Sequence, residues 1–135
     1  MNLHIQLDDP VTESEVIDLY SANKWSSAEK PEQLMAALSN SHSLVTARVE
    51  KRLVGLGNAM SDGYLVVYYP HMLVHPDFHR RGIGKQMMQA MQIKYSGFHQ
   101  QMLVADGEAI EFYRSLGSAP AGKTQSMWIY GESDH

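Results

Sequence analysis

Alternating apolar and polar positions predict where this chain forms strands. Residues 3–7 alternate in this way and precede the turn sequence Asp-Asp-Pro, which is typical of a half-buried strand. Further runs of strand type cover residues 44–49, 53–57, 64–74, 102–104 and 127–130. Turn signals at 50–52 and 61–63 separate the central runs, so we predict an antiparallel meander there.

Three residues within the central runs predict local irregularity. Gly55 and Gly57 weaken their strand and indicate a bulge or a place where another group packs close. Pro70 lies inside the long run 64–74, and proline donates no N–H to a ladder. We therefore expect a bulge at Pro70, or a strand that splays from its neighbour there.

Apolar residues at helical spacing predict four helices. Thr12 stands three residues before Glu15 in a capping-box pattern, which predicts a helix over about 13–24. Pro31 opens a second helix. The apolar faces of the later two helices comprise Ile83, Met87, Ala90 and Met91, and then Ala109, Phe112, Tyr113 and Leu116.

The order of these elements defines the fold class. Asp106 is expected to cap the last helix, while Gly97 and Gly117 end the last two. The order is then β-α-α-β-β-β-α-β-α-β, with a right-handed parallel crossover around residues 83–96. We predict a single domain over residues 1–135 with an α/β fold, in which helices flank a central mixed sheet.

Composition narrows the class of protein. The 135 residues include 11 Lys+Arg, 15 Asp+Glu and no cysteine. This charge balance gives no basic nucleic-acid footprint, and the lack of cysteine excludes disulfides and thiolate metal ligands. No window approaches the roughly 18 apolar residues of a membrane helix, and the N-terminus lacks a signal-peptide pattern. We expect a cytoplasmic protein without nucleic-acid or membrane partners.

A basic, glycine-containing loop leads into the third helix. Its residues are Arg80, Arg81, Gly82, Ile83, Gly84 and Lys85. The first N–H groups of a helix lack intrahelical acceptors and favour anions, so the loop predicts a pyrophosphate cradle. Met87 and Gln86 stand where a dinucleotide fingerprint needs glycine and a P-loop needs Ser or Thr, which excludes both. A tight turn without a ligand is the remaining alternative.

Two segments resemble motifs of the GNAT superfamily of N-acetyltransferases. Residues 74–84, VHPDFHRRGIG, are similar to its acetyl-CoA-binding segment, and residues 109–117, AIEFYRSLG, are similar to its C-terminal helix. The separation of the two motifs and the element order also match that family. The turn at 61–63, residues 105–107 and the ending at 127–130 resemble small bacterial members and their plant arylalkylamine relatives.

Three positions depart from the family pattern. His79 replaces the usual Arg or Gln, which puts its side-chain contact to phosphate in doubt. Asp106 stands where many members carry an Asn that contacts the cofactor, and Ser118 replaces an aromatic residue.

The resemblance implies direct acetyl transfer from acetyl-CoA to an amine. A backbone N–H near Leu73 or Val74 would polarise the thioester oxygen, and Tyr113 would protonate the departing thiolate. A purely structural, core-face role is the alternative for Tyr113. The implied acetyl-CoA-binding residues are Met72, Leu73, Val74, His79, Arg80, Arg81, Gly82, Ile83, Gly84, Lys85 and Asp106.

The general base and the acceptor are less constrained by the sequence. His71, next to Pro70, is the candidate base because histidine titrates near neutral pH; His75, Asp62 and solvent are alternatives. His71 and His75 would lie roughly 13 Å apart in a strand, so we predict no metal site. The aromatic residues that would wall an acceptor pocket, or instead fill the core, are Trp25, Tyr64, Tyr68, Tyr69 and Trp128, the core being favoured for Tyr68 and Trp128.

The expected function is therefore N-acetylation of the primary amine of a small molecule. An acyl-CoA-binding sensor without turnover and a protein or peptide N-acetyltransferase are the alternatives. The apolar ending at 127–130 needs cover, which leaves a homodimer open.

Overall fold

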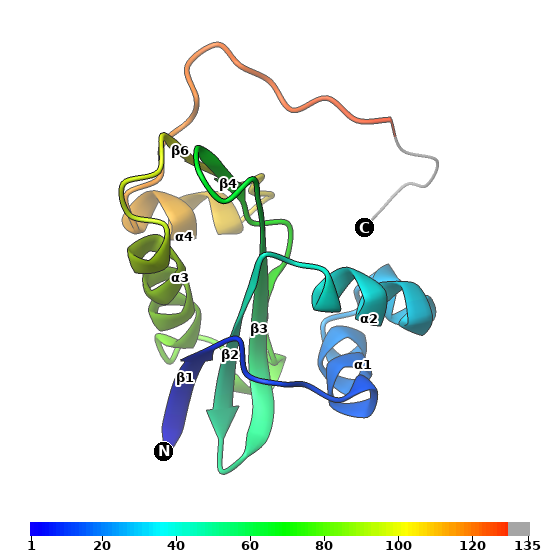
Figure 1. Ribbon diagram of the computed structural model, residues 1–135. Helices are drawn as coiled ribbons and strands as arrows, with labels where there is room; N and C mark the ends of the chain where they lie inside the picture. Colours follow the sequence, from blue (N-terminus) through cyan, green and yellow to red (C-terminus); the bar gives the residue numbers. More distant parts are fainter. Residues whose placement is uncertain (130–135) are drawn as a thin grey trace.

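Helices flank both faces of one sheet in the computed structural model, which describes residues 1–129 (Figure 1). The strands are β1 (Leu3–Leu7), β2 (Ser43–Val49), β3 (Arg52–Ser61), β4 (Val66–Tyr68), β5 (Met72–Val74) and β6 (Gln100–Met102). The helices are α1 (Glu13–Ala22), α2 (Pro31–Ser39), α3 (Ile83–Lys94) and α4 (Ala109–Ser115), with short 3-10 turns at Ser26–Glu29 and Pro76–Phe78. The predicted α/β class with a mixed sheet is confirmed.

The sheet runs in the order β1-β2-β3-β4-β6, and β5 pairs separately with β3. β1, β2 and β3 form antiparallel ladders, whereas β4 and β6 are parallel. Helix α3 lies between β5 and β6 in the chain, so the predicted parallel connection through this helix is present.

The first helix begins at the predicted capping box. Thr12 N–H donates to Glu15 Oε2 at 2.8 Å, and Glu15 N–H donates to Thr12 Oγ1 at 3.4 Å. Arg48 of β2 then bonds Glu15 Oε1 at 2.9 Å and Asp9 Oδ2 at 2.8 Å. Hydrogen bonds from Arg48 hold the pKa of Glu15 below its ordinary value, so α1 is joined electrostatically to the sheet.

Glycines in β3 permit the close packing that the sequence predicts. A Cβ atom built on Gly55 would lie 2.6 Å from Met87 Sδ on α3, and one on Gly57 would lie 2.6 Å from Met72 Cε on β5. The ladder between β2 and β3 also shifts register after Ala47. Both predicted irregularities, close packing and a bulge, are therefore found.

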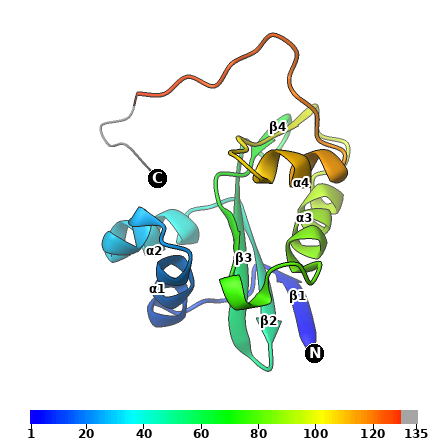
Figure 2. The same ribbon diagram turned by 180° about the vertical axis from the view of Figure 1, so that it is seen from behind.

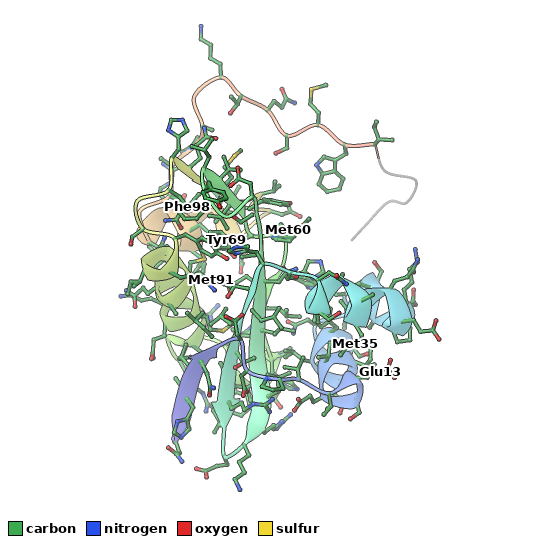
Figure 3. The ribbon with its side chains drawn as sticks, viewed as in Figure 1. Glu13, Met35, Met60, Tyr69, Met91 and Phe98 are labelled. Atoms are coloured by element: carbon green, nitrogen blue, oxygen red, sulfur yellow. The ribbon has the colours of Figure 1, made fainter. Side chains whose placement is uncertain are left out.

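Two cores lie on opposite faces of the sheet, one under α3 and one under α1 and α2. Figure 2 shows from behind how these helices flank the sheet. Figure 3 shows Tyr69 and Met91 on the α3 side and Met35 on the side of α1 and α2. The core under α3 includes Val45, Ala47, Val54, Ile83, Met87, Met88, Met91 and Tyr95. The core under α1 and α2 includes Val16, Leu19, Tyr20, Leu34, Leu38, Leu53, Leu56 and Leu73.

The structure differs from the sequence prediction in the C-terminal third. Helix α4 begins at Ala109 with Glu108 as its cap residue, so the prediction that Asp106 caps this helix is wrong. Met127–Ile129 form no strand, and no strand of the described sheet pairs with them. Tyr130 and the expected frayed tail lie outside the described residues.

Candidate active site

The site forms where the predicted long strand 64–74 divides. β4 pairs with the end of β3 through Met60–Tyr68, whereas β5 pairs further back, from Gly57–Met72 to Gly55–Val74. Pro70 lies between the two, so the predicted splay is confirmed. The opening is a cleft of about 780 Å³ lined by Trp25, Tyr68, Tyr69, Pro70, His71, Met72, Val104, Ala105, Asp106, Ala109, Tyr113, Gln125, Ser126 and Trp128.

The edge of β5 that faces away from β3 offers backbone groups to a ligand. His71 O accepts from Asn58 N–H, and His75 N–H donates to Val54 O, so residues 71 and 75 point their polar backbone groups at β3. The alternation of an antiparallel ladder directs Leu73 the same way and Met72 and Val74 outward. The N–H of Leu73 is therefore engaged in the ladder, and Val74 remains the candidate for polarising a thioester oxygen.

The start of α3 has the geometry of an anion cradle. Gly82 is the cap residue with φ 76°, and a Cβ atom built on it would meet nothing within 4 Å. Arg80 also has a positive φ of 62°, so the chain turns sharply before the helix. The side chains of Arg80, Arg81 and Lys85 are all exposed beside the helix N-terminus. This arrangement suits a multiply charged anion.

Two side chains of this loop are held by neighbours. His79 Nε2 lies 2.7 Å from Val74 O, so its ring braces the loop against β5. The Arg81 guanidinium lies 5.2 Å from the centre of the Phe78 ring, a cation–π contact.

One wall of the cleft is built around His71. Its Nδ1 and the hydroxyl of Tyr20 are hydrogen-bonded at 2.8 Å, and its ring packs edge-on against Trp25 at 5.2 Å. Its backbone N–H donates to Asn58 Oδ1 at 3.0 Å, while Asn58 Nδ2 donates to Ser41 Oγ at 3.0 Å. Burial raises the pKa of Tyr20, so this hydroxyl stays protonated. The Tyr20 hydroxyl thus holds the imidazole ring of His71, and Asn58 holds its backbone.

Sequence reasoning missed both partners of His71. Tyr20 falls on the apolar face of α1, where its ring alone accounts for its position. Asn58 offered a clearer signal, because it is a polar residue inside the buried stretch of β3.

The opposite wall carries Tyr113 on α4. Burial raises the pKa of this hydroxyl, so it remains a proton donor at neutral pH. The neighbouring Phe112 reaches α3, where a Cβ atom on Gly84 would lie 3.3 Å from its ring. The absence of a side chain at Gly84 therefore lets α4 approach the anion cradle.

Several candidates from the sequence lie outside the cleft. His75 Nδ1 accepts from Asp77 N–H at 3.1 Å, and Asp62 Oδ1 accepts from Tyr64 and Leu65 N–H at 2.8 Å each. Both are occupied by local turns and neither lines the cleft. Tyr64 is likewise 85% exposed and away from it.

The aromatic lining agrees only in part with the sequence prediction. Tyr69 is buried, and its hydroxyl donates to Gln101 Oε1 at 2.6 Å. Tyr68 and Trp128 are 40% and 55% exposed and line the cleft, so the core role favoured for them is wrong.

Neither a metal-binding cluster nor a membrane-spanning helix is found within residues 1–129. No group of three or more His, Asp or Glu side chains is placed to hold a metal ion in this range. Its helices are also too short or too polar to cross a membrane.

The chain is similar to acetyltransferases in sequence and structure. An N-acetyltransferase, ycf52, of Gracilaria tenuistipitata var. liui is 31% identical over 83 residues, which is 58% of this chain and 46% of that protein. A histone acetyltransferase, TAP1, of Glycine max is 28% identical and covers 71% of this chain and 48% of its own length. The chain thus spans about half the length of the curated relatives it matches.

Solved structures share its fold over nearly the whole chain. A GNAT family acetyltransferase from Streptococcus pneumoniae TIGR4 has a TM-score of 0.84 and 29% identity, covering 96% of this chain and 99% of its own. The aminoglycoside N-acetyltransferase AAC(6')-Iy, in complex with CoA, has a TM-score of 0.71 at 16% identity over 97% of this chain and 95% of its own. The sequence model of the acetyltransferase (GNAT) domain matches residues 40–117. This chain therefore belongs to the GNAT acetyltransferase family.

Proposed function

We propose that the protein transfers an acetyl group from acetyl-CoA to a primary amine of a small molecule. The observation that carries this proposal is the single cleft shared by His71 and Tyr113, beside the outward edge of β5. One side chain can accept a proton and the other can donate one. Acyl transfer to an amine needs both, because the ammonium loses a proton and the thiolate gains one.

The residues present fit acetyl-CoA. The open space at Gly82 and the N–H groups at the start of α3 suit the pyrophosphate, with Arg80, Arg81 and Lys85 adding positive charge. The outward N–H and O of Met72 suit an amide of the pantetheine arm, which would lie along β5 as an added strand does, whereas Val74 O is already bonded to His79. The solved CoA complex of a structurally similar acetyltransferase supports this assignment.

Proton transfer follows from the contacts of His71 and Tyr113. When His71 Nδ1–H donates to the Tyr20 oxygen, Nε2 is the unprotonated ring nitrogen and can accept the proton of the amine. The Val74 N–H polarises the thioester oxygen, and the half-buried Tyr113 hydroxyl delivers a proton to the leaving sulfur. Each role belongs to a different element: β5, the 69–71 link and α4.

The cleft walls favour an amine with an aromatic or hydrophobic body. Trp25, Tyr68 and Trp128 present ring surfaces, and Asp106 adds a carboxylate to the same cleft. A protonated amine is attracted to both ring faces and carboxylates. The name of the soybean relative, a histone acetyltransferase, favours a protein lysine as a second candidate acceptor.

A screen for release of free CoA tests the proposal. The purified protein is incubated with acetyl-CoA and, separately, arylalkylamines, polyamines, amino acids and lysine-containing peptides. Release with small amines, strongest for those with aromatic bodies, is the expected result. Release with peptides alone would move the acceptor to protein lysine. Binding of acetyl-CoA without release in any arm would favour the sensor.

A further inference from the structure

The chain passes from β4 to β5 with one residue more than the strand it faces. β3 pairs with β4 through Met60 and Tyr68, and with β5 through Gly57 and Met72. Between these pairs, two residues of β3 lie opposite the three residues 69–71. An extra residue of this kind is a β-bulge, and it breaks the regular alternation of side chains between the two faces of the sheet.

The bulge decides which face of the sheet receives the His71 ring. Tyr69 packs in the core under α3, and a regular strand would direct His71, two positions later, to that same face. Instead the His71 ring contacts Tyr20 and Trp25 in the core under α1 and α2. Leu73 lies in this second core as well. Figure 1 shows α1 and α2 across the sheet from α3, so the bulge turns His71 to the opposite face.

The side chain of Asn58 takes the place of a main-chain group at this bulge. Two opposed residues of an antiparallel ladder ordinarily exchange both hydrogen bonds through their backbones. Asn58 N–H donates to His71 O at 3.0 Å in this way, but His71 N–H donates to the side-chain Oδ1 of Asn58, also at 3.0 Å. Pro70 brings no N–H to the ladder. The Asn58 amide therefore ties the bulged backbone to β3.

The other end of the same amide is anchored to α2. Asn58 Nδ2 donates to Ser41 Oγ at 3.0 Å, and Ser41 Oγ donates to Ala37 O at 2.8 Å. Asn58 is 4% exposed, so water does not replace these bonds when one of them breaks. With the oxygen and the nitrogen both engaged, the amide has one orientation, and the position of the bulge follows from it.

We propose that Asn58 is a positioning residue for acetyl transfer, a role that rests on the proposed function of His71 as the base. Its amide fixes the bulge, and the bulge turns the imidazole toward Trp25 and the cleft. Asn58 is absent from the lining of the cleft, so its effect on the reaction passes through His71.

Histidine NMR tests the placement of the ring without any turnover. The ring current of Trp25, whose centre lies 5.2 Å from that of His71, shifts the His71 ring protons, and His71→Gln assigns their signals. In Asn58→Ala these signals should move toward those of an exposed histidine. The exposed His4 on the edge strand β1 is the internal control, and its signals should stay. Unmoved His71 signals in folded Asn58→Ala would overturn the proposal.

Kinetics of variants at the end of α2 test the effect on the reaction. Asn58→Ala should lower kcat about 10-fold at an unchanged KM for acetyl-CoA, because the base is misplaced. Ser41→Ala removes only the anchor of the amide and should lower kcat less, whereas Ser41→Thr keeps the hydroxyl and should restore it. Ser39→Ala is the matched control, since it removes a similar bond, to Ala36 O at 3.1 Å, and should leave kcat unchanged.

The NMR and kinetic measurements separate the role of Asn58 from the function of the protein. Displaced His71 signals with a parental kcat would overturn the positioning role, as would a Ser41→Ala rate equal to that of Ser39→Ala. A wild-type protein that turns over no acceptor would remove the proposed function instead. The His71 signals in Asn58→Ala would still decide whether this amide places the ring.

Discussion

The two walls of the cleft between His71 and Tyr113 come from regions that are packed very differently. His71 belongs to the part of the chain up to Tyr95, which contains every residue that is buried among the 129 described. Tyr113 belongs to residues 96–129, where every side chain is half-buried or exposed. Figure 3 shows the labelled core residues Tyr69 and Met91 on the α3 side of the sheet.

This difference in packing predicts that substitutions in the first region change mainly the stability of the fold, and that substitutions on α4 change mainly the reaction rate. Removing a group from the first region leaves a cavity or an unsatisfied partner in a close-packed core. Removing one from α4 disturbs mainly the contact of Phe112 with Gly84 and the Gln92 Nε2 bond to Leu116 O. We therefore expect substitutions in the first region to lower the free energy of unfolding, and those on α4 to lower the rate.

Tyr113→Phe should give the largest effect and only on the rate. The variant keeps the ring and loses the proton donor, so kcat falls about 10²-fold or more while KM for acetyl-CoA changes little. Steady-state kinetics with the acceptor from the screen measures both constants. The melting temperature should stay close to that of the parent. A parental kcat would reduce Tyr113 to a packing residue.

Gly55→Val should show the opposite pattern. The Cβ atom alone would lie 2.6 Å from Met87 Sδ and 3.1 Å from Ala47 Cβ, so the buried Met87 side chain must repack. Overpacking of this kind lowers the free energy of unfolding by about 1–3 kcal/mol, which urea titration measures. The exposed Ala121→Val is the matched substitution in the second region, with an expected change within about 0.5 kcal/mol. Equal losses in both variants would contradict the contrast between the regions.

The same contrast explains what could be predicted from the sequence. Local signals decided two parts of the first region: the capping box at Thr12 and the hairpin after Val49 both fold as their neighbours in sequence dictate. In the second region a strand at residues 127–130 was predicted from its apolar run, and the described residues 127–129 of that run form no strand. A strand needs a partner edge as well as a pattern, and sequence periodicity does not specify that partner.

Within the site, the prediction that the basic loop leads into a helix is confirmed, but the sequence did not indicate what holds His71. The cradle depends on consecutive residues, Arg80 to Lys85, whose spacing is visible in one line. The Tyr20–His71 bond joins residues 51 positions apart, and only the packing of α1 on the sheet brings them together. Such a contact produces no recurring sequence pattern, either in α1 or in the residues around His71.

Tyr20→Phe should lower the rate less than Tyr113→Phe does. It tests whether a tyrosine packed in the first region orients His71 in the cleft. The ring packing on Trp25 is retained, but His71 Nδ1 loses its hydroxyl partner. We expect kcat to fall roughly 10-fold at an unchanged KM for acetyl-CoA, because the imidazole is less well oriented. The molecule supplies its own control: Tyr95 and His42 form a similar bond of 2.7 Å away from the cleft. Tyr95→Phe should leave kcat unchanged.

The hydroxyls of Tyr20 and Tyr95 should also make the free energy of unfolding fall as the pH rises into the alkaline range. Burial raises the pKa of Tyr20 and of Tyr95 above the ordinary value of 10.0, so each protonated hydroxyl stabilises the fold fully below pH 10. That contribution is lost as the pH rises toward the folded-state pKa, so each Phe variant should lose less unfolding free energy than the parent between pH 9 and about pH 11. Urea titrations across this range measure the loss.

If Tyr95→Phe also lowered kcat 10-fold, the Tyr20 effect would reflect general loosening of the core rather than the orientation of His71.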